Sequence, residues 1–161
     1  MFASRTFTFL ALAASLVDVH AQSTTPFTDV ATGIIFQQCT SMSVFSFGIA
    51  LPEDAGTDFI GQISASTPGW ATITLTGSMR NSLLAVAWPN EGSVYSWLRT
   101  TTGYSNPGMF DGDAVFKTIP KGTSVNATGF TFTLLCERCI VEGKAFDVTA
   151  ETHVLGLGYV D

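Results

Sequence analysis

Short runs of β-branched and aromatic residues, separated by turn residues, recur along the chain, and no long stretch has helical periodicity. In residues 128–135, Phe130, Phe132 and Leu134 alternate with threonine, which predicts a strand with one buried face. The other expected strands are residues 33–38, 44–51, 59–65, 70–75, 82–88, 94–99, 114–119, 145–150 and 153–160. This spacing, with no linker between the runs, predicts one all-β domain: an antiparallel β-sandwich of two packed sheets, immunoglobulin-like in architecture.

The N-terminal segment has the composition of a secretion signal. Arg5 precedes an apolar run over residues 7–17, and small-residue character at Ala21 suggests a signal-peptidase site. The apolar run is shorter than the roughly 20 residues that a membrane-spanning helix needs. We therefore expect residues 1–21 to be a cleaved signal peptide and residues 22–161 to be one extracellular, secreted domain with no membrane span.

The charge balance is acidic. The chain carries 7 basic and 13 acidic side chains, for a formal net charge of −6, and the signal peptide holds one of each kind. No cluster of lysine and arginine offers the basic stripe that contacts phosphates, so we expect no nucleic-acid partner. Asn126 opens an Asn-Ala-Thr sequon in a turn before an expected strand, which predicts N-glycosylation and agrees with secretion.

Three cysteines follow the signal peptide, and two of them, Cys136 and Cys139, form a Cys-x-x-Cys motif. In an oxidising compartment this motif favours a small disulfide loop over half of a zinc site, because no second pair of ligands completes the tetrahedron. A thioredoxin-like redox motif is less favoured, because it needs a helix behind it and none is expected there. Cys39 is left over, and we interpret it as a small buried apolar residue at a strand end.

The mature chain offers little for nucleophilic or acid–base catalysis. His153 is its only histidine, it has no Gly-x-Ser-x-Gly motif, and its acidic residues lie mainly in expected turns. An extracellular hydrolase is therefore the weakest hypothesis that we keep.

Met79 lies in a polar, glycine-containing connection rather than in an expected strand. Two interpretations are open. The side chain either fills a gap beneath the turn, or its thioether serves as a soft axial ligand to haem iron with an imidazole on the opposite side.

The passage over residues 69–88 carries the most specific motif: a strand opened by Trp70, a Gly-x-Met-x-Asn turn, and an apolar strand that ends in Ala-Trp. This order resembles the b-type cytochrome domain of fungal cellobiose dehydrogenases, a DOMON-like β-sandwich. The similarity continues in residues 27–29, 32–34, 47–48, 53–61, 99–107, 112–114, 126 and 132–139. It covers nearly all of residues 22–161.

The resemblance implies a two-sheet sandwich that holds one haem b between a methionine and a histidine. Met79 matches the methionine ligand by its place in the motif, and Cys136 and Cys139 match the family's short disulfide. The aromatic residues that would either line the haem slot or belong to the core are Trp88, Tyr104 and Phe110.

The resemblance also implies redox partners. In the full enzymes such a domain passes single electrons from a flavin dehydrogenase domain to copper-dependent polysaccharide monooxygenases, so we expect a role in extracellular oxidative polysaccharide degradation. The sequence contains no dinucleotide-binding fingerprint, so we do not expect it to be catalytic by itself.

The histidine ligand has two alternative assignments. Either residues 154–159 are the family's apolar strand, so that the histidine-bearing segment is missing and the domain is shortened at its C-terminus, or a deletion brings that segment forward and His153 is the ligand. A rival hypothesis of a different class is a haem-free β-sandwich that binds a carbohydrate or another ligand through Trp70, Trp97 and Tyr104.

Overall fold

The computed structural model describes residues 23–41, 43–54, 56–150 and 152–160. The expected signal peptide, residues 1–21, lies outside them. In this part of the chain there are twelve strands and one turn of 3-10 helix, η1 (Pro120–Gly122). None of its helices is long and apolar enough to cross a membrane.

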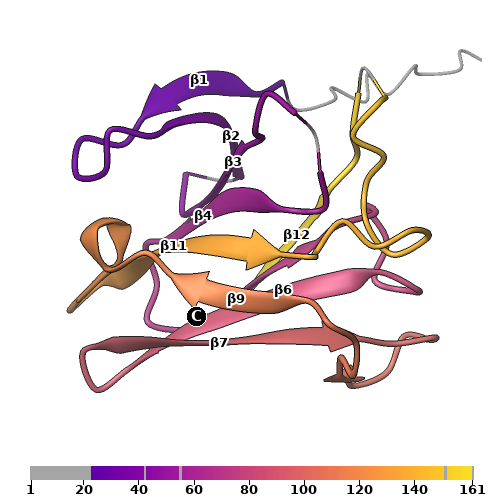
Figure 1. Ribbon diagram of the computed structural model, residues 1–161. Coiled ribbons are helices and arrows are strands. Elements are labelled where there is room, and N and C mark those ends of the chain that lie inside the picture. The colour runs from indigo at the N-terminus through magenta and orange to yellow at the C-terminus, as the bar shows by residue number, and fades with distance from the viewer. Residues whose placement is uncertain (1–22, 42, 55, 151, 161) are drawn as a thin grey trace, which may run out of the picture.

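The strands form two antiparallel sheets, with β6 and β7 of one sheet below β1 to β4 of the other (Figure 1). The larger sheet, sheet A, has the order β1 (Thr25–Thr28), β2 (Ile35–Ser41), β3 (Phe45–Ala50), β4 (Phe59–Ala65), β11 (Gly129–Glu137) and β10 (Ser124–Asn126), and β9 (Val115–Thr118) also pairs with β11. The smaller sheet, sheet B, has the order β12 (Gly156–Tyr159), β5 (Ala71–Thr74), β6 (Leu83–Asn90), β7 (Ser93–Thr100) and β8 (Gly108–Met109). The predicted antiparallel sandwich is confirmed.

The core lies between the two sheets and is built from alternate positions of their strands. In β11, Phe130, Phe132 and Leu134 are buried, as their period-two spacing predicts. In β5, Ala71 and Ile73 have no exposed area and belong to the same buried cluster. Because alternate residues of a strand point to opposite faces, the intervening side chains of sheet B lie on its outer surface.

The segment that follows the disulfide differs from expectation. Residues 145–150, expected as a strand, form turns instead. Asp147 Oδ1 accepts hydrogen bonds from the Thr149 backbone N–H at 2.9 Å and from its hydroxyl at 2.7 Å, which stabilises a turn in place of strand pairing. Phe146 nevertheless buries its ring beside Phe59. Of the last expected strand, residues 153–160, the four residues of β12 pair with β5.

Cys136 and Cys139 are fully buried and joined by a disulfide, so this prediction is confirmed. Between them, Arg138 has a left-handed backbone (φ 55°), and its N–H donates to Asp58 Oδ1 at 2.7 Å. This backbone hydrogen bond lowers the pKa of the Asp58 carboxyl. Cys39, half-buried in β2, is a free thiol, and burial raises its pKa.

Candidate functional site

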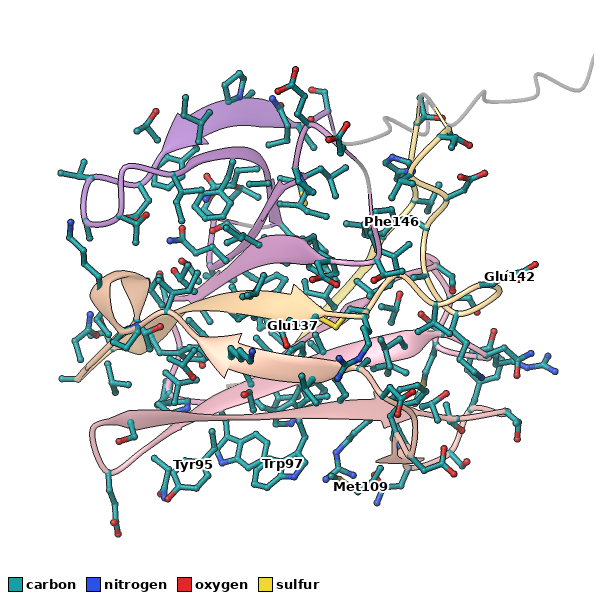
Figure 2. The ribbon with its side chains drawn as sticks, in the orientation of Figure 1. Tyr95, Trp97, Met109, Glu137, Glu142 and Phe146 are labelled. Carbon is teal, nitrogen blue, oxygen red and sulfur yellow. A yellow bond between two sulfur atoms is a disulfide. The ribbon has the colours of Figure 1, made fainter. Side chains whose placement is uncertain are left out.

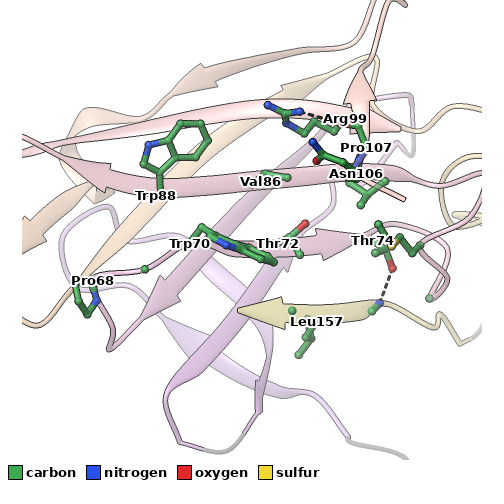
Figure 3. A pocket seen from close by; sticks show the side chains of 16 residues that line it. Pro68, Trp70, Thr72, Thr74, Val86, Trp88, Arg99, Asn106, Pro107 and Leu157 are labelled. Atoms are coloured by element: carbon green, nitrogen blue, oxygen red, sulfur yellow. Dashed lines mark hydrogen bonds between the residues drawn. The ribbon is translucent and has the colours of Figure 1, made fainter. Parts of the chain in front are cut away.

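The outer face of sheet B is hollowed into a cavity of about 860 Å³, seen from close by in Figure 3. This volume lies within the range of about 300–1,000 Å³ that is usual for ligand and cofactor sites. Its apolar wall comes from the outward positions of β6, which are Leu84, Val86 and Trp88. The inward positions of the same strand, Leu83 and Ala85, belong to the core. One strand therefore supplies both the core and the cavity.

Two glycines of β12 keep the cavity open at the edge of sheet B. Leu157 and Tyr159 pack against the core, so Gly156 and Gly158 are left on the outward side of the strand. A Cβ at Gly156 would stand 2.5 Å from Thr74 Oγ1, and a Cβ at Gly158 would stand 3.0 Å from Thr72 Cγ2. Larger residues at these positions would project onto the surface that the cavity occupies.

Met79 lines the cavity from the connection between β5 and β6. The Leu75 N–H donates to Leu83 O at 3.0 Å, and the Thr76 N–H donates to Ser82 Oγ at 3.1 Å, so the connection is closed at its base. Gly77 at φ 73° then gives a left-handed turn. This local structure places a thioether against an otherwise apolar wall. Met79 is thus the sequence-predicted ligand that the cavity does contain.

The cavity has few polar groups, and two of them, on Arg99 and Thr72, lack part of the hydrogen bonding that such groups usually have. Arg99 Nη1 donates to Pro107 O at 2.8 Å, which leaves further N–H donors of its guanidinium in the cavity wall. No aspartate or glutamate is among the described residues that line the cavity. Thr72 Oγ1 is buried there without a hydrogen-bond partner, a state that costs free energy unless a bound group completes it. The site therefore suits a large apolar group that carries negatively charged or hydrogen-bonding substituents.

Aromatic side chains continue from the cavity along the outer face of β7. The rings of Trp88 and Trp97 are stacked with centroids 5.0 Å apart, and Tyr95 stacks on each of them at 6.2 Å. Figure 2 shows Tyr95 and Trp97 projecting away from the sandwich. Trp70, which is 42% exposed, lines the cavity on the other side.

The other two aromatic candidates lie elsewhere. Phe110 packs against the core, which fits the core interpretation. Tyr104 is 79% exposed and lies under the guanidinium group of Arg80. Of the three residues proposed to line or back a haem slot, Trp88 alone lines the cavity.

His153 does not line the cavity. It is exposed, and its imidazole packs against the Phe146 ring with centroids 5.0 Å apart. Its neighbour Val154, however, lies against Gly77 in the Met79 turn. The structure thus brings Met79 into the cavity and leaves His153 outside it, against Phe146, so the assignment of His153 as a ligand stays a prediction.

Several cavity residues were missed from the sequence. Arg99 alternates along β7 with Tyr95 and Trp97, which point outward. Strand alternation could therefore have placed Arg99 on the outer face of sheet B. The glycines of β12 could not be placed in the same way. Their role depends on which strand pairs with β5, and this pairing is a long-range property.

Comparison with known proteins agrees with the geometry. The sequence pattern of the family described as the cytochrome domain of cellobiose dehydrogenase matches residues 27–160. A pyrroloquinoline quinone-dependent pyranose dehydrogenase from Coprinopsis cinerea is 30% identical over 123 residues, which are 73% of this chain and 17% of that protein. The chain therefore spans only a small part of this relative.

Two solved structures share the fold. The cytochrome domain of Myriococcum thermophilum cellobiose dehydrogenase has a TM-score of 0.68 and 30% sequence identity, covering 88% of each chain. The cytochrome b domain of pyranose dehydrogenase from Coprinopsis cinerea has a TM-score of 0.76 and 24% identity, covering 85% of this chain and 73% of that one. The chain belongs to the family of cytochrome domains of cellobiose dehydrogenase.

Proposed function

We infer that the cavity on sheet B binds haem b, that Met79 is one axial ligand, and that the protein carries single electrons. The observation that carries this proposal is the Met79 thioether in a large, mostly apolar cavity of a chain from this family. When bound, the haem iron supplies a reversible one-electron change between its ferric and ferrous states.

Different cavity residues would make different contacts with this group. A thioether is a soft ligand that favours the reduced iron and so raises the reduction potential. Leu84 and Val86 would exclude water from the ring. Arg99 would pair with the carboxylates of the haem, because its free donors lie in a wall without acidic side chains.

The ligand opposite Met79 has the same two candidates that the sequence left open. One is His153, whose imidazole rests on Phe146 and would have to turn toward the cavity. The alternative is that residues 154–159 are the family's apolar strand and that the histidine-bearing segment is missing. The exposure of His153 and the contact of its neighbour with the Met79 turn support keeping the first candidate.

Visible spectroscopy tests the proposal. Purified protein titrated with haem should show a strong Soret band and, after reduction, the sharp α-band of six-coordinate iron. Met79→Ala should abolish the six-coordinate spectrum, whereas Met109→Ala, at an exposed methionine in β8 of the same sheet, should leave it unchanged. If wild-type protein develops no Soret band, haem binding is ruled out. If His153→Ala keeps the wild-type spectrum, His153 is not the second ligand.

We further infer that the protein is exported after cleavage of residues 1–21 and is glycosylated at Asn126. Asn126 Oδ1 accepts hydrogen bonds from the Thr128 N–H at 2.9 Å and hydroxyl at 3.0 Å in an exposed turn, which supports access to the sequon. The electron donor would be a flavin dehydrogenase domain and the acceptor a copper polysaccharide monooxygenase. Oxidation of the reduced protein by such a monooxygenase in a stopped-flow mixing experiment would test the acceptor.

A second candidate function is carbohydrate binding without haem. The stack of Trp88, Trp97 and Tyr95, together with the exposed ring of Trp70, favours it, because sugar rings bind on aromatic surfaces. Retention on cellulose or soluble glucan by a haem-free protein, lost in Trp97→Ala, would support this function.

A further inference from the structure

We propose that Arg80 and Tyr104 form a clamp that positions the Met79 turn and thereby controls how firmly Met79 holds the iron of bound haem. The inference rests on the proposed function, because the clamp acts on the site only if Met79 is a ligand. Neither residue lines the cavity, so both are positioning residues.

The clamp joins the turn to the loop that follows β7. Arg80 Nε donates to the carbonyl oxygen of Thr102 at 3.3 Å, and the guanidinium carbon lies 5.9 Å from the centroid of the Tyr104 ring. This distance is within the range of a cation–π interaction. Arg80 directly follows Met79 in the chain, so these contacts limit the motion of the backbone that carries the thioether.

The loop is a fixed support because it is braced internally. Thr101 is nearly buried, and its hydroxyl donates to Gly103 O at 3.0 Å while it accepts from the Gly103 N–H at 3.2 Å. The Asn81 N–H donates to Thr101 O at 2.8 Å, which makes a second link between the turn and the loop. A turn attached to such a loop is expected to move less than a free surface turn.

The two side chains of the clamp can be substituted without changing the buried core. Arg80 is exposed and Tyr104 is 79% exposed, whereas Thr101 is buried and holds the turn through its backbone carbonyl oxygen. An exposed cation–π contact changes an equilibrium by about two- to fivefold. We expect a change of this size between the iron-bound and the released thioether.

The experiment measures competition at the iron. Imidazole is titrated into ferric, haem-loaded protein whose spectrum is six-coordinate, where it competes with Met79 for the iron, and its apparent affinity is followed by the absorption spectrum. Tyr104→Leu removes the ring and keeps the arginine charge, and Arg80→Lys keeps the charge and loses the planar guanidinium. Tyr104→Leu should bind imidazole about two- to fivefold more tightly than wild type, and Arg80→Lys, whose ammonium still attracts the ring, should show a smaller increase. Tyr104→Phe retains the ring and should behave as wild type.

A second measurement on haem-free protein separates this inference from haem binding itself. Methionine methyl groups are labelled with carbon-13, and the Met79 signal is assigned with Met79→Leu. Its order parameter should fall in Tyr104→Leu and Arg80→Lys but not in Tyr104→Phe, while circular dichroism shows that all three variants are folded.

The outcomes are distinct. Equal imidazole affinity in Tyr104→Leu and wild type overturns the clamp although haem binds. A gain in imidazole affinity in Tyr104→Phe as large as the gain in Tyr104→Leu also overturns it. Absence of a Soret band in wild type overturns the proposed function and the ligand role with it. An unchanged Met79 order parameter in haem-free Tyr104→Leu overturns the positioning role whether or not haem binds.

Discussion

Val154 lies so close to Gly77 that a Cβ added to the glycine would stand 2.5 Å from Val154 Cγ1. The segment that leads into β12 is thereby packed against the turn that carries Met79. A change in this contact is expected to alter the packing of both the edge strand β12 and the turn that carries Met79.

Gly77→Ala should therefore cost more stability than its backbone conformation alone explains. Gly143→Ala is the matched control, because Gly143 has φ 70° against 73° at Gly77 but no atom within 4 Å of an added Cβ. A left-handed conformation costs a non-glycine residue about 1–2 kcal/mol, which both variants should lose. The further loss in Gly77→Ala should become smaller when Val154→Ala is added, because Val154 Cγ1 is removed while Val154 Cβ and O stay 3.1 Å from the added Cβ. Urea denaturation compares these three variants with wild type, and equal losses in the two glycine variants would contradict the close contact.

Gly158→Leu should block haem loading without unfolding the sandwich. The added side chain would project onto the outer face of sheet B beside Thr72, into the cavity. Gly108→Leu is the control, because a Cβ at Gly108, in β8 of the same sheet, meets nothing within 4 Å. Haem titration monitored at the Soret band, with circular dichroism of the folded state, compares the two. Normal haem loading by Gly158→Leu would place the haem elsewhere.

Arg99→Leu should weaken haem binding by about tenfold, since a hydrogen bond to a charged group contributes roughly 1.5–3 kcal/mol and 1.4 kcal/mol corresponds to a factor of ten. The rate of haem transfer to an acceptor protein measures the effect. The dimethyl ester of haem, which lacks free carboxylates, should be bound equally by Arg99→Leu and wild type. A tenfold difference with the ester as well would mean that Arg99 acts through packing rather than through charge.

Asp58→Asn should reduce the loss of stability in acid. The Arg138 N–H lowers the pKa of Asp58 in the folded protein below its ordinary value of 3.8. A carboxyl with a lowered pKa contributes its stabilisation fully above the unfolded-state pKa and loses it as the pH falls through the folded-state pKa. Below about pH 4, the free energy of unfolding should therefore fall more steeply in wild type than in Asp58→Asn.

Asp58→Ala provides the comparison for this experiment. It removes the acceptor of the Arg138 N–H as well as the charge, so it should also lower stability at neutral pH. Identical pH profiles for wild type and Asp58→Asn, measured by denaturation between about pH 2 and pH 6, would show that the bond does not persist in solution.

Local patterns predicted what depends on neighbouring residues. The alternation around Phe132 identified a strand with one buried face, and the short Cys136–Cys139 spacing identified the disulfide. Met79 was recognised because a thioether in a polar turn is unusual and because the surrounding motif is specific. Each of these features is contained in a few consecutive residues.

Predictions failed or stayed open where a side-chain hydrogen bond in a turn, or packing against a distant segment, decides the structure. Residues 145–150 have the composition of a strand, but the Asp147 carboxylate bonds to Thr149 and makes a turn instead. His153 was singled out because it is the one histidine after the expected signal peptide, yet its position depends on how Phe146 and Val154 pack. Neither contact leaves a periodic pattern in the sequence.

The two outward glycines of β12 have a consequence for comparing this chain with others of the same fold. At Gly156 and Gly158 the edge strand contributes bare backbone to the outer face of sheet B, while Leu157 and Tyr159 still pack inward. A sandwich that needed no occupant on this face would gain by covering it with side chains. Glycine at alternate positions of this edge strand can therefore be looked for in an alignment. It would mark relatives in which a prosthetic group, instead of side chains, covers the outer face of sheet B.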